Sequence, residues 1–294
     1  MDIHIRDLSK RFKGGVTALD HVNLDVPTGM FGLLGANGAG KTTLMRILAG
    51  VLRPSAGTAT IGNHDLSSAA GRRDVQRTLG YLPQELGLYP DLTARSFLDY
   101  IAILKGLDDR TNRHDRVAQL LEVVSLTDDA DRKVGTFSGG MKRRVGIAQA
   151  LLSDPGLLIV DEPTSGLDPE ERIRFRNLLA GLGDRRTVLL STHIVEDIAS
   201  SCQRLAVMAK GRVLFAGEVT DLVEVARDRT WRVELPVGVT PEGDLTVVSA
   251  LHGGASVSYR VVSSGSYPIE GVPVEPTLED GYLTLMREPA TAGR

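Results

Sequence analysis

The glycine-rich stretch at residues 35–43, GANGAGKTT, fits the phosphate-binding pattern G-x-x-x-x-G-K-[ST]. Glycines let a backbone wrap so closely that its N–H groups point at a phosphate, and the start of a following helix adds the positive end of its dipole. Lys41 would then reach the outer phosphates, and the Thr42 hydroxyl would ligate Mg²⁺. The pattern predicts a nucleotide site formed by Gly35, Ala36, Asn37, Gly38, Ala39, Gly40, Lys41, Thr42 and Thr43.

The flanking segments decide whether this match is more than a glycine-rich turn. Met30–Leu34 is a short apolar run, as expected of a buried parallel strand. After the loop, apolar side chains recur at helical spacing until Gly50 and Pro54. These residues are Leu44, Ile47, Leu48 and Val51. Strand, loop and helix therefore follow in the order that a phosphate-binding loop needs.

Two adjacent carboxylates, Asp161 and Glu162, follow the apolar run Leu157–Val160. Carboxylates at the end of a buried strand are costly unless a positive charge lies beside them, and Mg²⁺ with phosphate would supply that charge. Neighbours along a strand point to opposite sides, so we expect Asp161 to face the metal and Glu162 to face an attacking water. The alternative is an exposed acid pair at a strand end.

Two further positions have a less specific pattern. Ser138-Gly139-Gly140 opens a predicted helix through Leu152, and the N–H groups at a helix start bind anions. A plain serine N-cap explains the same residues and is favoured when they are taken alone. His193 follows the apolar strand Thr187–Leu190, at the edge where open α/β sheets bind ligands. This position distinguishes His193 from the other histidines of the chain.

The composition limits the classes of protein that fit. With 34 basic and 37 acidic side chains, the net charge is -3, so no basic surface argues for binding of nucleic acid. Cys202, the single cysteine, can form no internal disulfide, which indicates the reducing cytosol. The first residues lack the features of a signal peptide, and no apolar run approaches the roughly 18 residues that span a bilayer. We expect a cytoplasmic chain that reaches a membrane only through a partner.

A change in the pattern of apolar and polar residues at about residue 221 divides the sequence into two expected domains, residues 1–220 and 221–294. The first begins with short alternating strands around a turn, and a helical insertion interrupts it at about residues 90–150. The second has short alternating strands and a final helix that begins after Pro276, and no residue in it suggests chemistry. We expect an α/β fold with a small C-terminal α+β domain.

Together these motifs resemble those of the ATP-binding cassette (ABC) ATPase family, from about Ile3 to Val219. The resemblance implies a P-loop, RecA-like core with an antiparallel β subdomain and a helical insertion, and ATP and Mg²⁺ as cofactors. In that family, residues 35–43 correspond to the Walker A loop and Ser138–Gly140 to the signature motif. The other correspondences are Phe12 with the aromatic that stacks on adenine, Gln84 with the Q-loop, Asp161 and Glu162 with Walker B and the glutamate after it, Asp168 with the D-loop acid, and His193 with the switch histidine.

The resemblance also implies a reaction, phosphoryl transfer from ATP to water, in which catalysis is positioning and stabilisation of charge. Lys41 would neutralise charge on the transferred group, and Glu162 would orient and deprotonate the water. His193 would hold the γ-phosphate and the water, and Gln84 would link the metal site to the helical insertion. The implied metal ligands are Thr42, Gln84 and Asp161.

In this family two cassettes close head to tail around ATP. The present chain contains one copy of each motif, so a second chain, identical or not, must complete the site. Ser138 and the N–H groups of Gly139 and Gly140 would then touch the γ-phosphate that the partner binds.

Two positions depart from the commonest family pattern, because Phe137 stands where Leu is usual and Met141 where Gln is usual. These variants, with the phrases at 32–38 and 276–280, resemble the cassettes of bacterial drug and polysaccharide exporters of the ABC-2 type. That resemblance implies the ATPase subunit of an exporter. It would dock through Gln84–Leu92 onto a separate integral-membrane permease, at the inner face of the cell membrane.

Two other functions are alternatives. A non-transport ABC protein would act as a nucleotide-switched binding factor, but neither tandem cassettes nor a long coiled-coil insertion is present in the sequence. A GTPase or small-molecule kinase fits less well, because the guanine-reading N-K-x-D is missing and Ser138-Gly139-Gly140 has no place in it.

Overall fold

The structure is a computed structural model that describes residues 1–183, 186–263 and 271–287. The chain forms two compact units, Met1–Cys202 with Met208–Val213, and Gln203–Val207 with Leu214–Arg294. The expected domain boundary at residues 220 and 221 falls inside helix α8 (Val219–Glu224). The expected second domain also includes residues 264–270 and 288–294, which lie outside the described residues.

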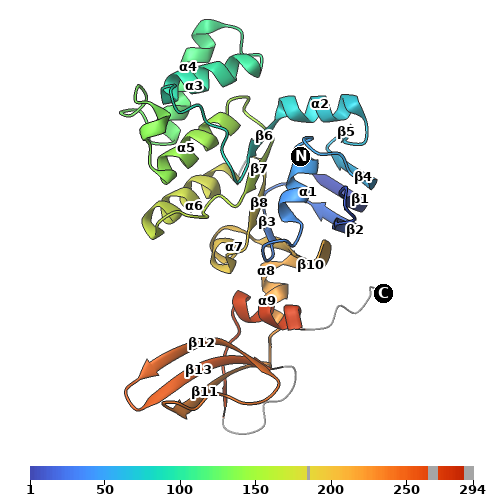
Figure 1. The fold of residues 1–294 in the computed structure, drawn as a ribbon, viewed down its shortest axis with the longest axis vertical. Helices are drawn as coiled ribbons and strands as arrows, with labels where there is room; N and C mark the ends of the chain where they lie inside the picture. The colour runs from blue at the N-terminus through green and yellow to red at the C-terminus, as the bar shows by residue number, and fades with distance from the viewer. Residues whose placement is uncertain (184–185, 264–270, 288–294) are drawn as a thin grey trace. The chain divides into compact units, whose positions relative to one another are not determined.

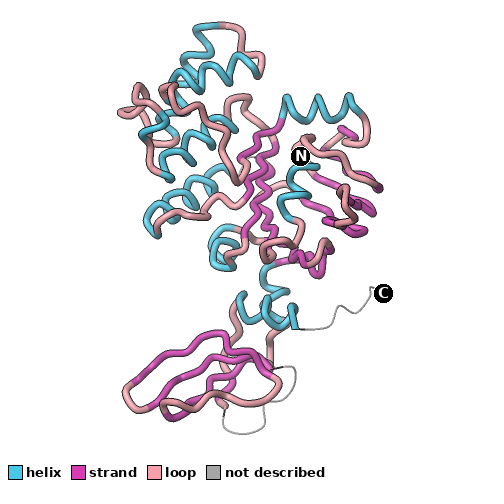
Figure 2. The backbone as a smooth tube through the Cα atoms, viewed as in Figure 1, coloured by secondary structure: helices cyan, strands magenta, loops and turns pink. Residues whose placement is uncertain are grey.

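Parallel strands form the centre of the first unit, in the order β3-β8-β7-β6. Their residues are largely buried and apolar, the pattern of a parallel sheet that is covered on both faces. Leu34 pairs with Thr192 and Asp161 with Ser191, so the carboxyl ends of these strands lie at one edge. The strands, magenta in Figure 2, are β3 (Met30–Leu34), β6 (Leu79–Leu82), β7 (Leu157–Asp161) and β8 (Thr187–Thr192).

Helix α1 (Lys41–Leu48) packs between the central sheet and a second, antiparallel sheet (Figure 1). The predicted order of strand, phosphate-binding loop and helix is therefore confirmed, as is the α/β fold class with an antiparallel β subdomain. The second sheet has the order β2-β1-β4-β5. Its strands are β1 (Ile3–Arg11), β2 (Thr17–Val26), β4 (Ala56–Ile61) and β5 (His64–Asp65).

Helices α6 (Pro169–Gly183) and α7 (Val195–Ser201) cover the other face of the central sheet (Figure 1). Gly32 on β3 lets α7 approach closely, because a Cβ there would lie 2.5 Å from Cδ1 of Ile198. Cys202 follows α7, and burial together with the charge of Asp197 raises the pKa of its thiol to about 12. The single cysteine thus packs as a small hydrophobic residue.

Helices α3, α4 and α5 occupy the predicted insertion and lie together in Figure 1. Each begins with a side chain, Thr93, Asp109 or Ser138, that accepts a hydrogen bond from a backbone N–H of the first turn. The fully buried ring of Phe97 on α3 belongs to the core of this region. The bounds are α3 (Ala94–Leu104), α4 (Arg110–Val123), the short 3₁₀ turn Val134–Thr136 and α5 (Gly139–Ala150).

Helix α2 (Ala69–Thr78) has no counterpart among the predicted elements. It buries only Gly71 and Val75, so its sequence lacks the apolar repeat that marks a packed helix. A cap compensates in part, because Ser68 accepts a hydrogen bond from the N–H of Gly71. No helix in the described part of the chain is long and apolar enough to cross a membrane.

The second unit contains an antiparallel sheet in the order β12-β13-β11-β14. Val233, Val257, Tyr259 and Val261 form the core on one face of this sheet. The strands are β11 (Thr230–Pro236), β12 (Leu245–Gly253), β13 (Ser256–Ser263) and β14 (Val272–Pro273), followed by helix α9 (Leu278–Arg287). Strands β9 (Arg204–Ala209) and β10 (Arg212–Glu218) flank the predicted turn at 210–211, and each contains residues of both units.

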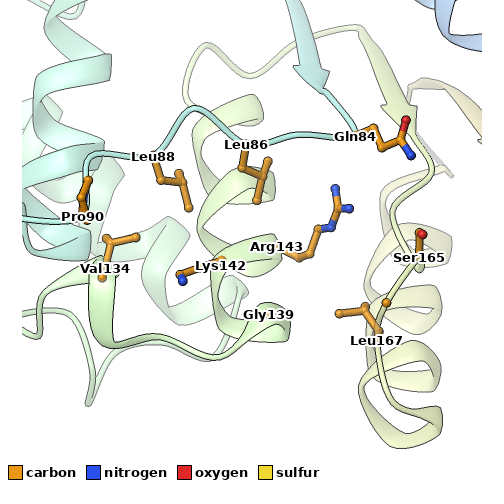
Figure 3. A pocket seen from close by; sticks show the side chains of 12 residues that line it. Gln84, Leu86, Leu88, Pro90, Val134, Gly139, Lys142, Arg143, Ser165 and Leu167 are labelled. Carbon is orange, nitrogen blue, oxygen red and sulfur yellow. The ribbon is translucent and has the colours of Figure 1, made fainter.

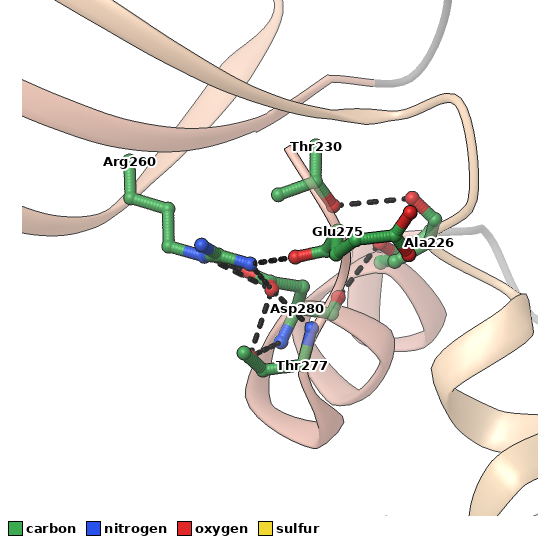
Figure 4. Close-up of polar contacts among 7 residues, drawn as sticks. Ala226, Thr230, Arg260, Glu275, Thr277 and Asp280 are labelled. Atoms are coloured by element: carbon green, nitrogen blue, oxygen red, sulfur yellow. Dashed lines mark hydrogen bonds and ion pairs between the residues drawn. The ribbon is translucent and has the colours of Figure 1, made fainter. Parts of the chain in front are cut away.

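A buried carboxylate fixes the start of α9 (Figure 4). Asp280 is fully buried, and both of its oxygens accept hydrogen bonds from Nε of Arg260 on β13 at 3.0 Å. Its Oδ2 also accepts from the backbone N–H of Thr277 at 2.6 Å, while the Thr277 hydroxyl accepts from the N–H of Asp280 at 3.4 Å. This reciprocal pair is a capping box, so one residue both caps α9 and ties it to the sheet.

We expect Asp280→Ala to lower the free energy of unfolding of the second unit by about 2–4 kcal/mol, because it removes the cap of α9 and leaves the partly buried Arg260 guanidinium without its carboxylate partner. Urea unfolding followed by the fluorescence of Trp231, the single tryptophan and a residue of β11, measures this loss. The exposed neighbour supplies the control, since Glu279→Ala is expected to cost no more than about 1 kcal/mol. Equal midpoints for the two variants would contradict the prediction.

Candidate functional site

The loop after β3 holds its shape through glycines that no other residue replaces without strain. Gly38 and Gly40 have φ values of 81° and 105°, in the left-handed region. A Cβ on Gly35 would lie 2.4 Å from the carbonyl oxygen of Met208, so the backbone approach there requires glycine. The exposed residues of the loop are Ala36, Asn37 and Gly38, and their backbone is open to a ligand.

Lys41, the first residue of α1, is enclosed by the loop that precedes it. Its side chain is 4% exposed, and Nζ donates hydrogen bonds to the carbonyl oxygens of Gly35 at 2.6 Å and Ala36 at 3.3 Å. The loop is therefore wrapped around a buried positive charge at the start of a helix, which is the arrangement that attracts phosphate.

Glu162 connects Lys41 to His193. Oε1 of Glu162 lies 3.1 Å from Nζ of Lys41, and Oε2 lies 2.5 Å from Nδ1 of His193. The Glu162 side chain is 5% exposed, whereas the His193 side chain is 39% exposed. A buried carboxylate is thus compensated by a lysine on one side and held against a solvent-accessible histidine on the other.

Glu162 does not continue strand β7, because its φ is 50°. This left-handed conformation is uncommon for a residue with a side chain and costs of order 1–3 kcal/mol. Asp161 and Glu162 have different partners, but strand alternation is not the reason. The chain turns at Glu162, and its N–H donates to the carbonyl oxygen of Ser191 at 3.0 Å.

Asp161 presents one satisfied and one unsatisfied oxygen. The residue is fully buried, and Oδ1 accepts a hydrogen bond from the hydroxyl of Ser191 at 2.5 Å. Oδ2 is also buried and has no hydrogen-bond partner within the described ranges. Those ranges contain no group of three His, Cys, Asp or Glu side chains that would hold a metal alone. The donor set therefore fits Mg²⁺ bound by one carboxylate, a hydroxyl such as that of Thr42, and phosphate oxygens.

The Ser138-Gly139-Gly140 turn lies apart from this cluster. Ser138 caps α5, and its hydroxyl accepts from the N–H of Met141 at 3.2 Å. Within the described residues, Ser138 shares no hydrogen bond with Lys41 or Glu162. Ser138 and Gly139 are exposed at the start of α5, and a Cβ on Gly139 would meet open space, whereas Gly140 is buried against the carboxylate of Glu171. The two groups therefore do not form one hydrogen-bonded cluster within this chain.

Gln84 lines a separate pocket of about 480 Å³ (Figure 3). It lies beyond the end of β6, exposed, and Arg143 of α5 points into the pocket toward it. Burial lowers the pKa of Arg143, and the charges of Asp161 and Glu162 oppose that shift. The lining combines apolar residues with two cations: Leu86, Leu88, Pro90, Val134, Leu167, Lys142 and Arg143, together with Gln84, Gly135, Gly139, Ser165 and Gly166.

Phe12 and Asp168, two other residues that the sequence predicted for the site, are both exposed and interact with residues near them in the chain. Phe12 follows β1 with its side chain 41% exposed, and the Lys10 ammonium lies 5.3 Å from the ring centroid. A ring with this exposure can stack on a flat ligand. Asp168 is exposed at the start of α6, where its carboxylate accepts from the N–H of Glu171 at 2.9 Å.

The sequence did not single out three polar side chains that support this site. Ser191 and Thr192 end β8, and Thr164 follows Glu162 closely. All three are buried, with hydroxyls bonded to carboxylates. The signal available in the sequence was the polar pair Ser191-Thr192 directly after the apolar run Val188–Leu190.

Comparisons with known proteins agree with this geometry. Residues 19–165 match the ABC transporter family. The chain is 39% identical to the Nod factor export ATP-binding protein I of Burkholderia orbicola (76% of this chain, 72% of the relative). It is 37% identical to the methionine import ATP-binding protein MetN of Streptomyces griseus (87% and 75%).

Two further matches concern length and fold. The chain is 38% identical to ATP-binding cassette sub-family A member 7 of Rattus norvegicus, but it spans only 10% of that relative. A solved dimeric structure of the ATP-binding cassette MJ0796, in a post-hydrolysis state bound to ADP and Pi, matches with a TM-score of 0.68 and 26% identity. That match covers 74% of this chain and 98% of the other.

Removing the charge of Asp161 is expected to separate folding from metal binding. Because Asp161→Asn removes a buried charge with an unpaired oxygen, we expect a melting temperature no lower than that of the natural chain. The extra stabilisation that Mg²⁺ adds to ATP should disappear, so ATP with Mg²⁺ should shift the melting temperature no more than ATP with EDTA. Thermal unfolding under the two conditions measures both effects.

The control is Asp154→Asn, at an aspartate that is 73% exposed. This variant should keep the full Mg²⁺-dependent shift. An undiminished shift in Asp161→Asn would show that Asp161 does not bind the metal.

Proposed function

This chain belongs to the ABC transporter family, and we propose on that premise that it is the ATPase subunit of an exporter, working as a dimer under a separate membrane permease. Members of this family bind and hydrolyse ATP, so the chain is an ATPase. The observation that supports the residue roles is the continuous contact from Lys41 through Glu162 to His193, beside the glycine loop.

Each residue of that contact has a role that its surroundings support. Lys41 would bind the β- and γ-phosphates, because its charge is buried against the loop and cannot be screened by water. Glu162 would accept a proton from the attacking water, and His193 would hold the carboxylate and the γ-phosphate in line. Mg²⁺, when bound by Asp161 and Thr42, would supply positive charge that stabilises the phosphate oxygens.

The second half of the site would come from another chain. Ser138 and Gly139 are exposed and share no hydrogen bond with Lys41, which suits contact with a γ-phosphate held by a partner, with Gly140 behind them at the start of α5. The MJ0796 cassette that this chain resembles was solved as a dimer with ADP and Pi. We propose a homodimer, with Phe12 stacking on adenine and Asp168 lying at the shared interface.

The pocket beside Gln84 is the proposed docking place for the permease. Its apolar floor, formed by Leu86, Leu88 and Val134, suits a short apolar segment, and Lys142 and Arg143 suit an acidic residue at its end (Figure 3). Gln84, which lines the same pocket, would couple nucleotide binding to the docked permease. The chain would lie at the inner face of the cell membrane.

The direction of transport rests on one sequence feature. One reported relative is named for export and another for import, so relatives alone do not choose between them. Phe137 and Met141 around the Ser-Gly-Gly turn resemble ABC-2 exporters and favour export. Residues 221–294 form a proposed accessory domain of that exporter.

Glu162→Gln is expected to bind ATP with Mg²⁺ but to lower the turnover of hydrolysis by about 10²–10⁴-fold, because the amide cannot accept the proton. With hydrolysis blocked, ATP should hold a dimer of the 31.6 kDa chain that gel filtration detects. Phosphate release and elution volume are the two measurements. Lys41→Ala is the counterpart, since it should abolish tight ATP binding and show neither a dimer nor turnover.

Full turnover in Glu162→Gln would remove that residue from the reaction. Unchanged ATP affinity in Lys41→Ala would remove the glycine loop from the nucleotide site. If Glu162→Gln forms no dimer in the presence of ATP, the dimeric site is contradicted.

Docking at the pocket is tested by co-expression with a permease encoded beside the gene for this chain. Leu88→Asp should abolish co-purification of the two chains while leaving ATP hydrolysis by the free chain within about twofold, because the apolar Leu88 side chain has no group that binds phosphate or metal. The control is Val51→Asp, at an apolar residue that is 63% exposed outside the pocket. Equal co-purification of the two variants would place the permease elsewhere.

A further inference from the structure

Asp197 on α7 is a buried carboxylate for which the reaction described above has no role. Its residue is 1% exposed. Oδ2 accepts hydrogen bonds from the hydroxyls of Thr164 at 2.5 Å and Thr192 at 3.3 Å. Oδ1 has no hydrogen-bond partner in the described part of the chain, and the nearest cation is the Arg176 guanidinium, with Nη1 at 3.9 Å.

The two threonines lie at informative places in the chain. Thr164 comes two residues after Glu162, and Thr192 comes directly before His193. The Thr192 hydroxyl also accepts a hydrogen bond from the N–H of Ile194 at 3.0 Å, on the other side of His193. One carboxylate therefore holds the backbone that follows Glu162 and the backbone on both sides of His193.

His193 depends on such an anchor because its own side chain has little packing. The imidazole is 39% exposed, and within the described residues its recorded polar contact is the 2.5 Å approach to Glu162. A histidine that is half in solvent samples several rotamers unless its backbone and its partner are both fixed. The hydrogen bonds to Asp197 fix both.

A purely structural role explains this carboxylate less well. Taking a charge out of water costs several kcal/mol, and an apolar residue of similar volume often stabilises a core as well or better. A helix dipole does favour an acid in the first turn of α7, but by only about 0.3–1 kcal/mol at a surface. The Asp197 side chain also faces Thr164 and Thr192 rather than the N–H groups at the start of its own helix.

We propose that Asp197 is a positioning residue for ATP hydrolysis, which holds Glu162 and His193 in contact through Thr164 and Thr192. This inference rests on the proposed function of Glu162 and His193. Asp197 shares no hydrogen bond with Lys41 or the glycine loop, so we expect nucleotide binding to be retained without it.

Asp197→Ala should therefore lower kcat at least about tenfold while leaving the Kd for ATP with Mg²⁺ within about threefold. The same change in a His193→Ala background should lower kcat by a clearly smaller factor, because the part of the effect that acts through His193 is already lost. Steady-state hydrolysis and equilibrium nucleotide binding measure these quantities. A merely structural aspartate would lose activity equally in both backgrounds.

Two milder variants keep the test open if Asp197→Ala does not fold. Thr164→Val and Thr192→Val each remove one hydroxyl donor at nearly constant volume and leave the carboxylate in place. Each should lower kcat about two- to tenfold with ATP affinity retained. Glu196→Ala, at the exposed neighbour on the same turn of α7, should leave both quantities unchanged.

The outcomes separate the two proposals. The proposed function stands if the natural chain hydrolyses ATP and Glu162→Gln does not. If, in addition, kcat of Asp197→Ala or of both valine variants stays within twofold of the natural value, Asp197 has no positioning role. A full additional loss in the His193→Ala background would equally overturn the positioning role. An inactive natural chain would overturn the proposed function and this inference with it.

Discussion

The ion pair between Lys41 and Glu162 is the constraint around which the first unit is arranged. Both side chains are at most 5% exposed and their charged atoms lie 3.1 Å apart, so each needs the other. Removing one partner of such a pair costs about 3–5 kcal/mol, because the remaining charge stays buried. The pair joins the loop after β3 to the end of β7, and the contact of Glu162 with His193 extends this connection to the end of β8.

Strand β8 supports the site on both of its faces. Successive side chains of a strand point to opposite sides, so Ser191 and Thr192 serve different partners. Ser191 donates to Asp161 on one side, and Thr192 donates to Asp197 on the other. The middle of the strand is apolar and buried, and its buried polar side chains lie at the two ends, where each hydroxyl has a partner.

The sequence predicted well which strands, loop and helix form the site. It predicted poorly the buried polar residues and the backbone turn that hold the site in place. Helix α2 was missed because a helix that buries two small residues has no apolar repeat. The left-handed φ of Glu162 was missed because glutamate rarely adopts it, and only the surrounding contacts impose it. Asp197 was passed over because an acid in the first turn of a helix reads as an ordinary surface residue.

The sequence by itself determined the glycine loop, the strand before it, the helix after it, and the polar residues at the ends of β7 and β8. Those features follow from local rules, since glycine content, apolar periodicity and strand ends are properties of neighbouring residues. Only the tertiary structure decided that Lys41, Glu162 and His193 meet and that Ser138 lies apart from them. Such meetings depend on the order and register of strands, β3 beside β8 and β8 beside β7, which the spacing of residues along the chain does not encode.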